Sequence, residues 1–328
     1  MIRRDVMLRT PLCDLLGVEH PILLAGMGGV SYSAVAAAVS EAGGFGCLGA
    51  AGMNHEEMTR EIRAVKARTT RPFGVDLLTA SPRDMVPFVE TICAEGARAF
   101  VAGLGVPSKV VELCHRNGLL VINMCGKVRH AVAAVDAGCD IVVAQGTEAG
   151  GHTGQIATMP LVPMIVDAVK VPVVAAGGIF DGRGLVAALA LGAQGIWMGT
   201  RFIASTEARA HDLYKERILD IDETGTVITR AYSGKTMRAI RTSYTDEWET
   251  RRDELQPFPM QALRATQDGV WRSLAGPEAG LDPERDCMPA GQSAGGIHEV
   301  KPCREIIADI LRQAESILAT FSGLQEAR

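Results

Sequence analysis

Residues 171–202 read VPVVAAGGIFDGRGLVAALALGAQGIWMGTRF, and this stretch decides the fold. Two apolar runs stand at its ends, and a segment with helical periodicity lies between them. The runs do not alternate with polar residues, which is typical of parallel strands covered on both faces. Asp181 stands where a helix begins, and we interpret it as an N-cap rather than a catalytic residue. The stretch therefore predicts a strand–helix–strand unit.

The same rhythm runs through the chain from residue 21 onward. Helical patterns such as 33–43, 55–68 and 127–138 separate the apolar runs. The predicted strands are 21–26, 44–50, 73–78, 99–103, 119–125, 140–146, 171–178 and 195–202. Eight repeats that begin roughly 20 to 30 residues apart favour an α/β fold of the (β/α)₈ TIM-barrel type. A doubly wound open sheet is the alternative, but it more often has five or six strands and a reversal point.

The alternation of apolar runs and helical segments ends after Phe202. Residues 206–289 contain helical stretches, a β-branched segment with a Ser-Gly turn, and a loop rich in Pro, Gly and Asp. We expect this segment to be an inserted lid or small subdomain after strand eight. Residues 1–205 and 290–328 then form the barrel, and a last helix at about 302–321 closes it.

Composition narrows the functional classes. The chain has 328 residues, 47% of them hydrophobic, and a net charge of −5, so it lacks the basic field that holds nucleic acid. No apolar run approaches the roughly 20 residues of a membrane span, and residues 1–10 lack the apolar core of a secretory signal. The eight cysteines contain no CxxC pair, and no Cys/His spacing indicates a metal site. We expect a soluble, cytoplasmic protein without a nucleic-acid or membrane partner.

Glycines occur in two motifs that could bind phosphate, and we interpret only the second as a binding site. Residues 44–49 match GxGxxG, but they lie on a predicted strand with a helix before it, so we interpret them as packing residues. Gly177-Gly178 and Gly199-Thr200 instead end strands seven and eight, where this fold often binds phosphate through backbone N–H groups. Tight turns would also need glycine there.

His152 is the candidate general base. It lies in the Gly-rich segment 145–154 after strand six, at the barrel end where reactive groups gather. Glu148 in the same loop is an alternative base or an exposed charge. The sequence gives no comparable setting to four other histidines, which we interpret as structural or surface residues: His20, His115, His130 and His211.

These motifs together resemble a known family. The segments 20–30, 71–78, 145–154, 175–193, 198–205 and 290–297 are similar to those of the nitronate monooxygenases, once called 2-nitropropane dioxygenases. The same scaffold also resembles flavin-dependent enoyl-acyl-carrier reductases, related thioester reductases and certain NAD(P)H:quinone reductases. The resemblance implies bound FMN, with His152 as the catalytic base. The FMN contacts that it implies are Gly26, Met27, Asp76, Gln145, Gly150, Gly151, Gly177, Gly178, Trp197, Met198, Gly199, Thr200, Gln292 and Ser293.

Two positions depart from the family pattern. Position 76 is often Asn in the family, and here it is Asp76. An ionised carboxylate only accepts hydrogen bonds, whereas an amide also donates them, so the flavin-ring contacts should differ. Some quinone-reducing relatives carry a Lys at the end of strand five, where this chain has residues 123–125, NMC. Lys127 could only partly replace it.

The resemblance implies a small-molecule oxidoreductase and allows a homodimer. The first hypothesis is FMN-dependent oxidation of alkyl nitronates or nitroalkanes by O₂ to a carbonyl compound and nitrite. The alternative is reduction of an enoyl or dienoyl thioester, or of a quinone, with NAD(P)H as co-substrate. In that case Arg230, Arg238 and Arg241 could meet the phosphates of a carrier or coenzyme A. A catalytically idle flavoprotein is the third hypothesis.

Overall fold

A closed parallel barrel forms the centre of the computed structural model, which describes residues 8–79, 84–103 and 105–326. Its eight-stranded sheet has the order β1-β9-β8-β6-β5-β4-β3-β2. The strands are β1 (Ile22–Leu24), β2 (Gly46–Gly49), β3 (Phe73–Leu78), β4 (Ala99–Gly103), β5 (Leu120–Cys125), β6 (Ile141–Gln145), β8 (Val173–Ala176) and β9 (Gly195–Met198). A parallel bridge between Leu23 and Phe45 joins the two ends of this order and closes the barrel. The predicted fold class and its eight strands are confirmed.

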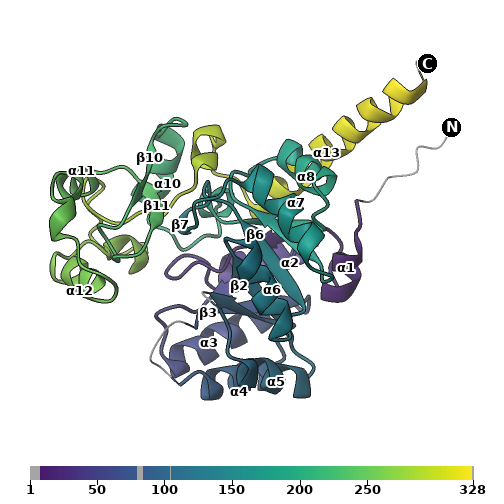
Figure 1. Cartoon of the computed structure of the whole chain (residues 1–328), viewed down its shortest axis with the longest axis horizontal. Coiled ribbons are helices and arrows are strands. Elements are labelled where there is room, and N and C mark those ends of the chain that lie inside the picture. The colour runs from purple at the N-terminus through teal and green to yellow at the C-terminus, as the bar shows by residue number, and fades with distance from the viewer. Residues whose placement is uncertain (1–7, 80–83, 104, 327–328) are drawn as a thin grey trace.

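Helices alternate with the strands and cover the barrel (Figure 1). They are α2 (Ser33–Glu41), α3 (His55–Lys66), α4 (Val86–Ala94), α5 (Ser108–Arg116), α6 (Val128–Asp136), α7 (Thr158–Ala168), α8 (Gly182–Ala190), the short α9 (Thr200–Ile203) and α13 (Cys303–Glu326). Helix α13 packs against α8 and α2, so the predicted last helix does complete the ring. The Asp181 side chain accepts hydrogen bonds from the backbone N–H groups of Arg183 and Gly184, which confirms its capping role.

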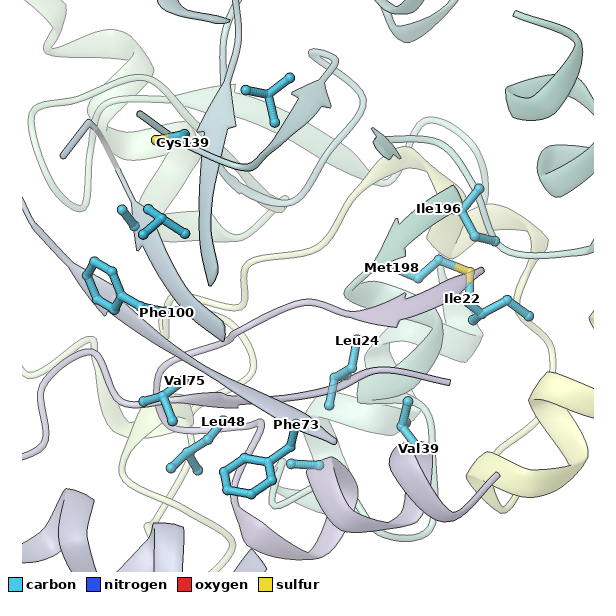
Figure 2. Packing of buried hydrophobic residues seen from close by; sticks show 14 of the residues in the cluster. Ile22, Leu24, Val39, Leu48, Phe73, Val75, Phe100, Cys139, Ile196 and Met198 are labelled. Carbon is cyan, nitrogen blue, oxygen red and sulfur yellow. The ribbon is translucent and has the colours of Figure 1, made fainter. Parts of the chain in front are cut away.

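The core has two layers, as the unalternating strands predict. Side chains that alternate along each strand point either into the barrel or outward onto the helices. The inner layer includes Leu23, Phe45, Val101 and Trp197, and α1 (Pro11–Leu16) plugs its lower end. Figure 2 shows the outer layer, in which Leu48 and Phe73 lie together and Val39 of α2 faces Leu24. Gly46, from the GxGxxG motif, lies so close to the Ala36 carbonyl that any side chain would overlap it, so that glycine serves packing.

The segment after α9 leaves the barrel and builds a second region, drawn in green to the left in Figure 1. It contains α10 (Asp212–Asp220), β10 (Thr226–Thr229), β11 (Met237–Ile240), α11 (Ser243–Thr250), α12 (Met260–Gln267) and the 3₁₀ turns η1 (Arg252–Glu254) and η2 (Arg272–Leu274). Its own apolar cluster includes Tyr232, Tyr244 and Trp248. The exact subdomain boundaries at 206 and 289 stay a prediction.

A second, three-stranded sheet joins this region to the barrel. Its order is β10-β11-β7, where β7 is only Gly151–His152 from the loop after β6. The structure thus places the predicted catalytic histidine on a strand of the inserted sheet. The chain returns through the turn η3 (Gln292–Gly296) to α13.

Three further observations concern the residues that the structure describes. None of their helices combines the length and apolarity of a membrane span. They contain no group of three or more His, Cys, Asp or Glu side chains arranged for a metal ion. All eight cysteines are free, and seven of them are buried.

Candidate active site

A cavity of about 570 Å³ lies at the carboxyl ends of the barrel strands. That size is within the range of about 300–1,000 Å³ that is usual for cofactor sites. Its wall contains almost every residue that the family resemblance implied: Gly26, Met27, Asp76, Gln145, Gly150, Gly151, His152, Gly177, Gly178, Trp197, Met198, Gly199, Thr200 and Ser293. Gln292 is outside this wall, because η3 turns its side chain to solvent while its backbone N–H donates to the Glu148 carbonyl. The structure therefore brings the predicted contacts together, with Gln292 as the exception.

Glycines shape the wall so that a flat group can approach the backbone. A Cβ atom on Gly26 would overlap the Asp76 side chain, and one on Gly49 would overlap the backbone of Met27. At Gly150 a Cβ would come within 2.7 Å of the Ala290 carbonyl carbon. The segments after β1, β2 and β6 can pack this closely only without side chains, which leaves the cavity open for a planar ring.

The end of the cavity near β8 and β9 suits a phosphate. Gly177 and Gly178 have φ of +104° and +74°, the left-handed region that favours glycine. The Thr200 hydroxyl oxygen accepts a hydrogen bond from the Gly291 N–H at 2.9 Å, which leaves its own proton free to donate. Among the described residues, no carboxylate lines this end of the cavity. The glycine wall, the cavity size and this donor set fit a flavin mononucleotide.

Asp76 is the acidic side chain at the centre of this cavity. It lies on β3, and its carboxyl group makes no hydrogen bond to another residue in the described part of the chain. Burial raises the pKa of Asp76 to about 8. At neutral pH the group is then protonated, and a protonated carboxyl donates one hydrogen bond and accepts others, as an amide does. The departure from the family's Asn is therefore smaller than the sequence indicates.

His152 is held in place from two sides. Its carbonyl accepts a hydrogen bond from Gln145 Nε2 at 2.8 Å, which ties it to the barrel. On the other side it pairs with Met237 of β11, while Gly151 pairs with Arg238. Gly151 has a φ of +73°, which lets the loop turn into this pairing. The position of the histidine thus depends on both the barrel and the inserted hairpin.

Ser233 fixes the imidazole ring. His152 Nε2 lies 2.9 Å from Ser233 Oγ, and the Ser233 hydroxyl donates to the Lys235 carbonyl at 3.3 Å. Either atom can donate in the contact between Nε2 and Oγ, and the tautomer of the ring decides which. Burial, and next the charge of Lys235, lower the pKa of His152 below its usual 6.5. A neutral imidazole keeps one ring nitrogen with a lone pair, so it is a competent base at neutral pH.

The alternative base, Glu148, has a structural role. Its two carboxylate oxygens accept hydrogen bonds from the Thr158 N–H at 3.0 Å, and one of them also accepts from the Thr158 hydroxyl. It therefore anchors the start of α7, and it does not line the cavity. The interpretation of Glu148 as a base is not supported by this geometry.

The three arginines expected to meet phosphates have other partners. Arg238 is buried and donates to the Thr147 carbonyl and the Thr226 hydroxyl. Arg230 donates to the Gly234 carbonyl, and Arg241 pairs with Asp246. Arg238 therefore supports the loop before His152, and Arg230 and Arg241 have contacts within the insertion; none of the three lines this cavity or the pocket beside it, so the geometry does not support the expectation.

A second pocket, of about 520 Å³, opens beside the first. Met124, Gln145 and His152 line both. The rest of its wall includes Lys127 from the loop after β5, His130 of α6, Lys235 from the hairpin turn and Val106 from the segment after β4. His130, expected to be only structural or exposed, therefore has a place at a cavity.

Sequence reasoning missed Ser233 and Lys235. Both lie in the segment SGK (233–235), which shows a turn but gives no sign of the strand that the turn faces. It also missed Trp271 and Leu274 of the insertion, which line the flavin cavity, and Leu274 packs directly against Gly29 in the loop after β1. The pairing of β7 with β11 brings the SGK turn to His152, and the contact with Gly29 brings the second pair to the cavity.

The comparison with known proteins agrees with this site. The sequence model of the family described as nitronate monooxygenase matches residues 9–99 and 83–313. The chain belongs to this family. Members of the nitronate monooxygenase family are flavin-dependent oxidoreductases, so this protein is an enzyme of that class.

Three relatives show how different the named activities are. A dehydrogenase of Mycobacterium tuberculosis, named for (3aS,4S,5R,7aS)-5-hydroxy-7a-methyl-1-oxo-octahydro-1H-indene-4-carboxyl-CoA, is 35% identical and covers 97% of this chain and 99% of its own. The structure of FabK from Thermotoga maritima superposes with a TM-score of 0.88 at 38% identity, over 96% of this chain and 99% of that one. Nitroalkane oxidase from Streptomyces ansochromogenes gives 0.81 at 28% identity, over 94% and 99%.

Proposed function

We propose that this nitronate monooxygenase family member is an FMN-dependent oxidoreductase of acyl thioesters, acting at the carbon next to the thioester carbonyl. The observation that carries the proposal is the second pocket, which opens at His152 and adds about 520 Å³ to the flavin cavity. A small nitronate has only a few heavy atoms and needs no such space. The 35% identity to a dehydrogenase of a CoA thioester supports the same substrate class.

FMN would lie in the cavity at the carboxyl ends of the strands. The backbone at Gly177 and Gly178, together with the Thr200 hydroxyl, would hold its phosphate. Asp76 and the glycines after β1 and β6 would face its ring. When bound, the flavin supplies the hydride chemistry at the substrate's β carbon, because no amino-acid side chain can carry a hydride.

His152 would move the accompanying proton. In the oxidative direction the neutral imidazole takes the proton from the α carbon as the double bond forms. In the reductive direction, with NAD(P)H as the source of electrons, the imidazolium returns that proton to the α carbon. The closed hairpin around His152 would keep the ring beside the substrate, and such general acid–base help contributes about 10² to 10⁴ in rate.

Nitronate oxidation is the second candidate, favoured by the family match and by the 28% identity to nitroalkane oxidase. The same His152 would remove the α proton of a neutral nitroalkane, and O₂ would accept the electrons as carbonyl compound and nitrite leave. The sequence ranked this reaction first. A homodimer and a cytoplasmic location stay predictions.

One anaerobic experiment separates the two candidates. The FMN-loaded protein is mixed with NADPH or NADH, and the flavin absorbance is followed; crotonyl-CoA is then added. Bleaching by the nicotinamide and recovery on crotonyl-CoA are the expected results. In air, the same protein is given propyl-2-nitronate, and nitrite is measured. Nitrite formation without any nicotinamide-driven bleaching would reverse the order of the two candidates.

A further inference from the structure

Two lysines give the wall of the second pocket positive charge. Lys127 and Lys235 line it together with His130 and His152, and none of the described residues that line it is an Asp or Glu. This is unusual in a chain whose net charge is −5. The pKa of His130 is lowered by partial burial and by the nearby charges of Arg129 and Lys127, so the local potential there is positive.

Both lysines at this pocket have no counter-ion in the described part of the chain. Lys66 and Lys301 show the contrast, because each forms an ion pair with a carboxylate. Lys127 makes no such pair, and Lys235 lies over the Phe258 ring with Nζ 4.3 Å from its centroid. The two come from different regions, Lys127 from the loop after β5 and Lys235 from the turn between β10 and β11.

The pocket continues into the flavin cavity. His152, Gln145 and Met124 form a wall that the two spaces share. Behind His152, the loop after β5 meets the histidine loop, where Gly126 and Gly154 approach so closely that a Cβ on Gly154 would lie 3.1 Å from the Gly126 carbonyl oxygen. A ligand with its reactive end at His152 can extend into the second pocket, whose wall includes both lysines.

We propose that Lys127 and Lys235 form a subsite for a phosphate group on the tail of a nucleotide-bearing ligand. Two ammonium groups without counter-ions match a phosphate, which carries up to two negative charges and several acceptor oxygens, better than a carboxylate with one. The phosphate belongs either to the coenzyme A part of the thioester or to a nicotinamide dinucleotide. The inference rests on the proposed function for the reactive end of the ligand, but the subsite itself is defined by the two lysines.

Calorimetric titration of the oxidised FMN-loaded protein tests the subsite without turnover. The probes are coenzyme A, NADPH, and pantetheine, which lacks phosphate. The variants are Lys127→Ala and Lys235→Ala. Lys170→Ala is the matched control, because Lys170 is exposed at the opposite end of the barrel and its loss changes the net charge equally.

Each pocket variant should weaken binding of the phosphate-bearing probe about tenfold, and added salt should shrink this difference. Lys170→Ala should bind as wild type does, and pantetheine binding should not change. Weaker coenzyme A binding identifies the thioester as the phosphate source, and weaker NADPH binding identifies the nicotinamide. Unchanged affinities in both lysine variants, or no binding of either probe to the wild type, overturn the subsite. The crotonyl-CoA and nitronate assays report separately on the proposed function.

Discussion

The two cavities that meet at His152 are built in different ways. The flavin cavity owes much of its wall to glycines in segments that follow barrel strands, and side chains such as Trp197 and, from the insertion, Trp271 complete it. The second pocket is walled by side chains, and its lysines come from the barrel and from the insertion. A wall of backbone N–H groups suits a cofactor that stays the same between relatives, because these groups are present whichever side chains the residues carry. A wall of side chains suits a substrate that differs between relatives, because substitutions can change its shape and charge. Each variant below tests this division between holding the cofactor and acting on the substrate.

The largest effect should come from a charge in the backbone wall. Gly178→Asp puts a carboxylate where the phosphate would lie, at a residue whose φ is +74°. The variant should purify without FMN and without activity. Gly118→Asp is the control: Gly118 has a φ of +70° and open space around it, and it follows α5. FMN released on denaturation measures the outcome. Retained FMN in Gly178→Asp would move the phosphate site elsewhere.

The next variant acts at the shared wall. His152→Ala should keep FMN and the fold but lose about 10² to 10⁴ in turnover. His115→Ala, which removes a hydrogen bond with Asp140 away from the site, should keep full activity. In the wild type the rate of α-proton removal should fall as the pH drops through the His152 pKa, which lies below 6.5, because only the neutral ring is a base. A nitroalkane and its preformed nitronate give a further check, since only the first still has a proton to lose.

A smaller effect is expected from the residue that positions the ring. Ser233→Ala removes the hydrogen bond to His152 Nε2, and turnover should fall about fivefold, in line with the roughly 1 kcal/mol of one such bond. Ser233→Thr keeps the hydroxyl and should restore most of the rate. FMN content and melting temperature should match those of the wild type in both variants. Equal losses in the Ala and Thr variants would mean that packing, and not the hydrogen bond, is what matters.

The smallest effect should come from Asp76, a side chain within the backbone wall. Because its pKa is about 8, Asp76→Asn should leave the flavin spectrum and FMN affinity nearly unchanged at pH 6.5. Between pH 7 and 9 the wild-type spectrum should change as the carboxyl group loses its proton, and the Asn variant should stay constant. A large difference at pH 6.5 would show that Asp76 is ionised beside the flavin.

The same contrast explains what the sequence could predict. The barrel strands are buried on both faces, so each leaves a continuous apolar run, and the predicted and observed strands agree to within a few residues. Glycines such as Gly26 and Gly177 could be found because close backbone approach and positive φ both demand that residue type. Capping at Asp181 is a local interaction and was equally visible.

The rest depends on contacts between distant segments. His152 and Ser233 lie 81 residues apart in sequence, and the two-residue strand β7 is too short to show a period. Lys235 looks like an ordinary turn residue until β11 pairs with β7. Gln292 was placed in the wall, but its segment forms a 3₁₀ turn in which neighbouring residues face different ways. Whether Glu148 is a base or an anchor depended on the position of Thr158, which the loop sequence does not reveal.

The pairing of β7 with β11 has a consequence for how such enzymes diverge. Substitutions in the hairpin can change the orientation and basicity of His152 through Ser233 and Lys235, while the glycine wall that would hold the flavin is left intact. Selection can therefore act on reaction type through the hairpin alone, with little change to the glycines of the cofactor site.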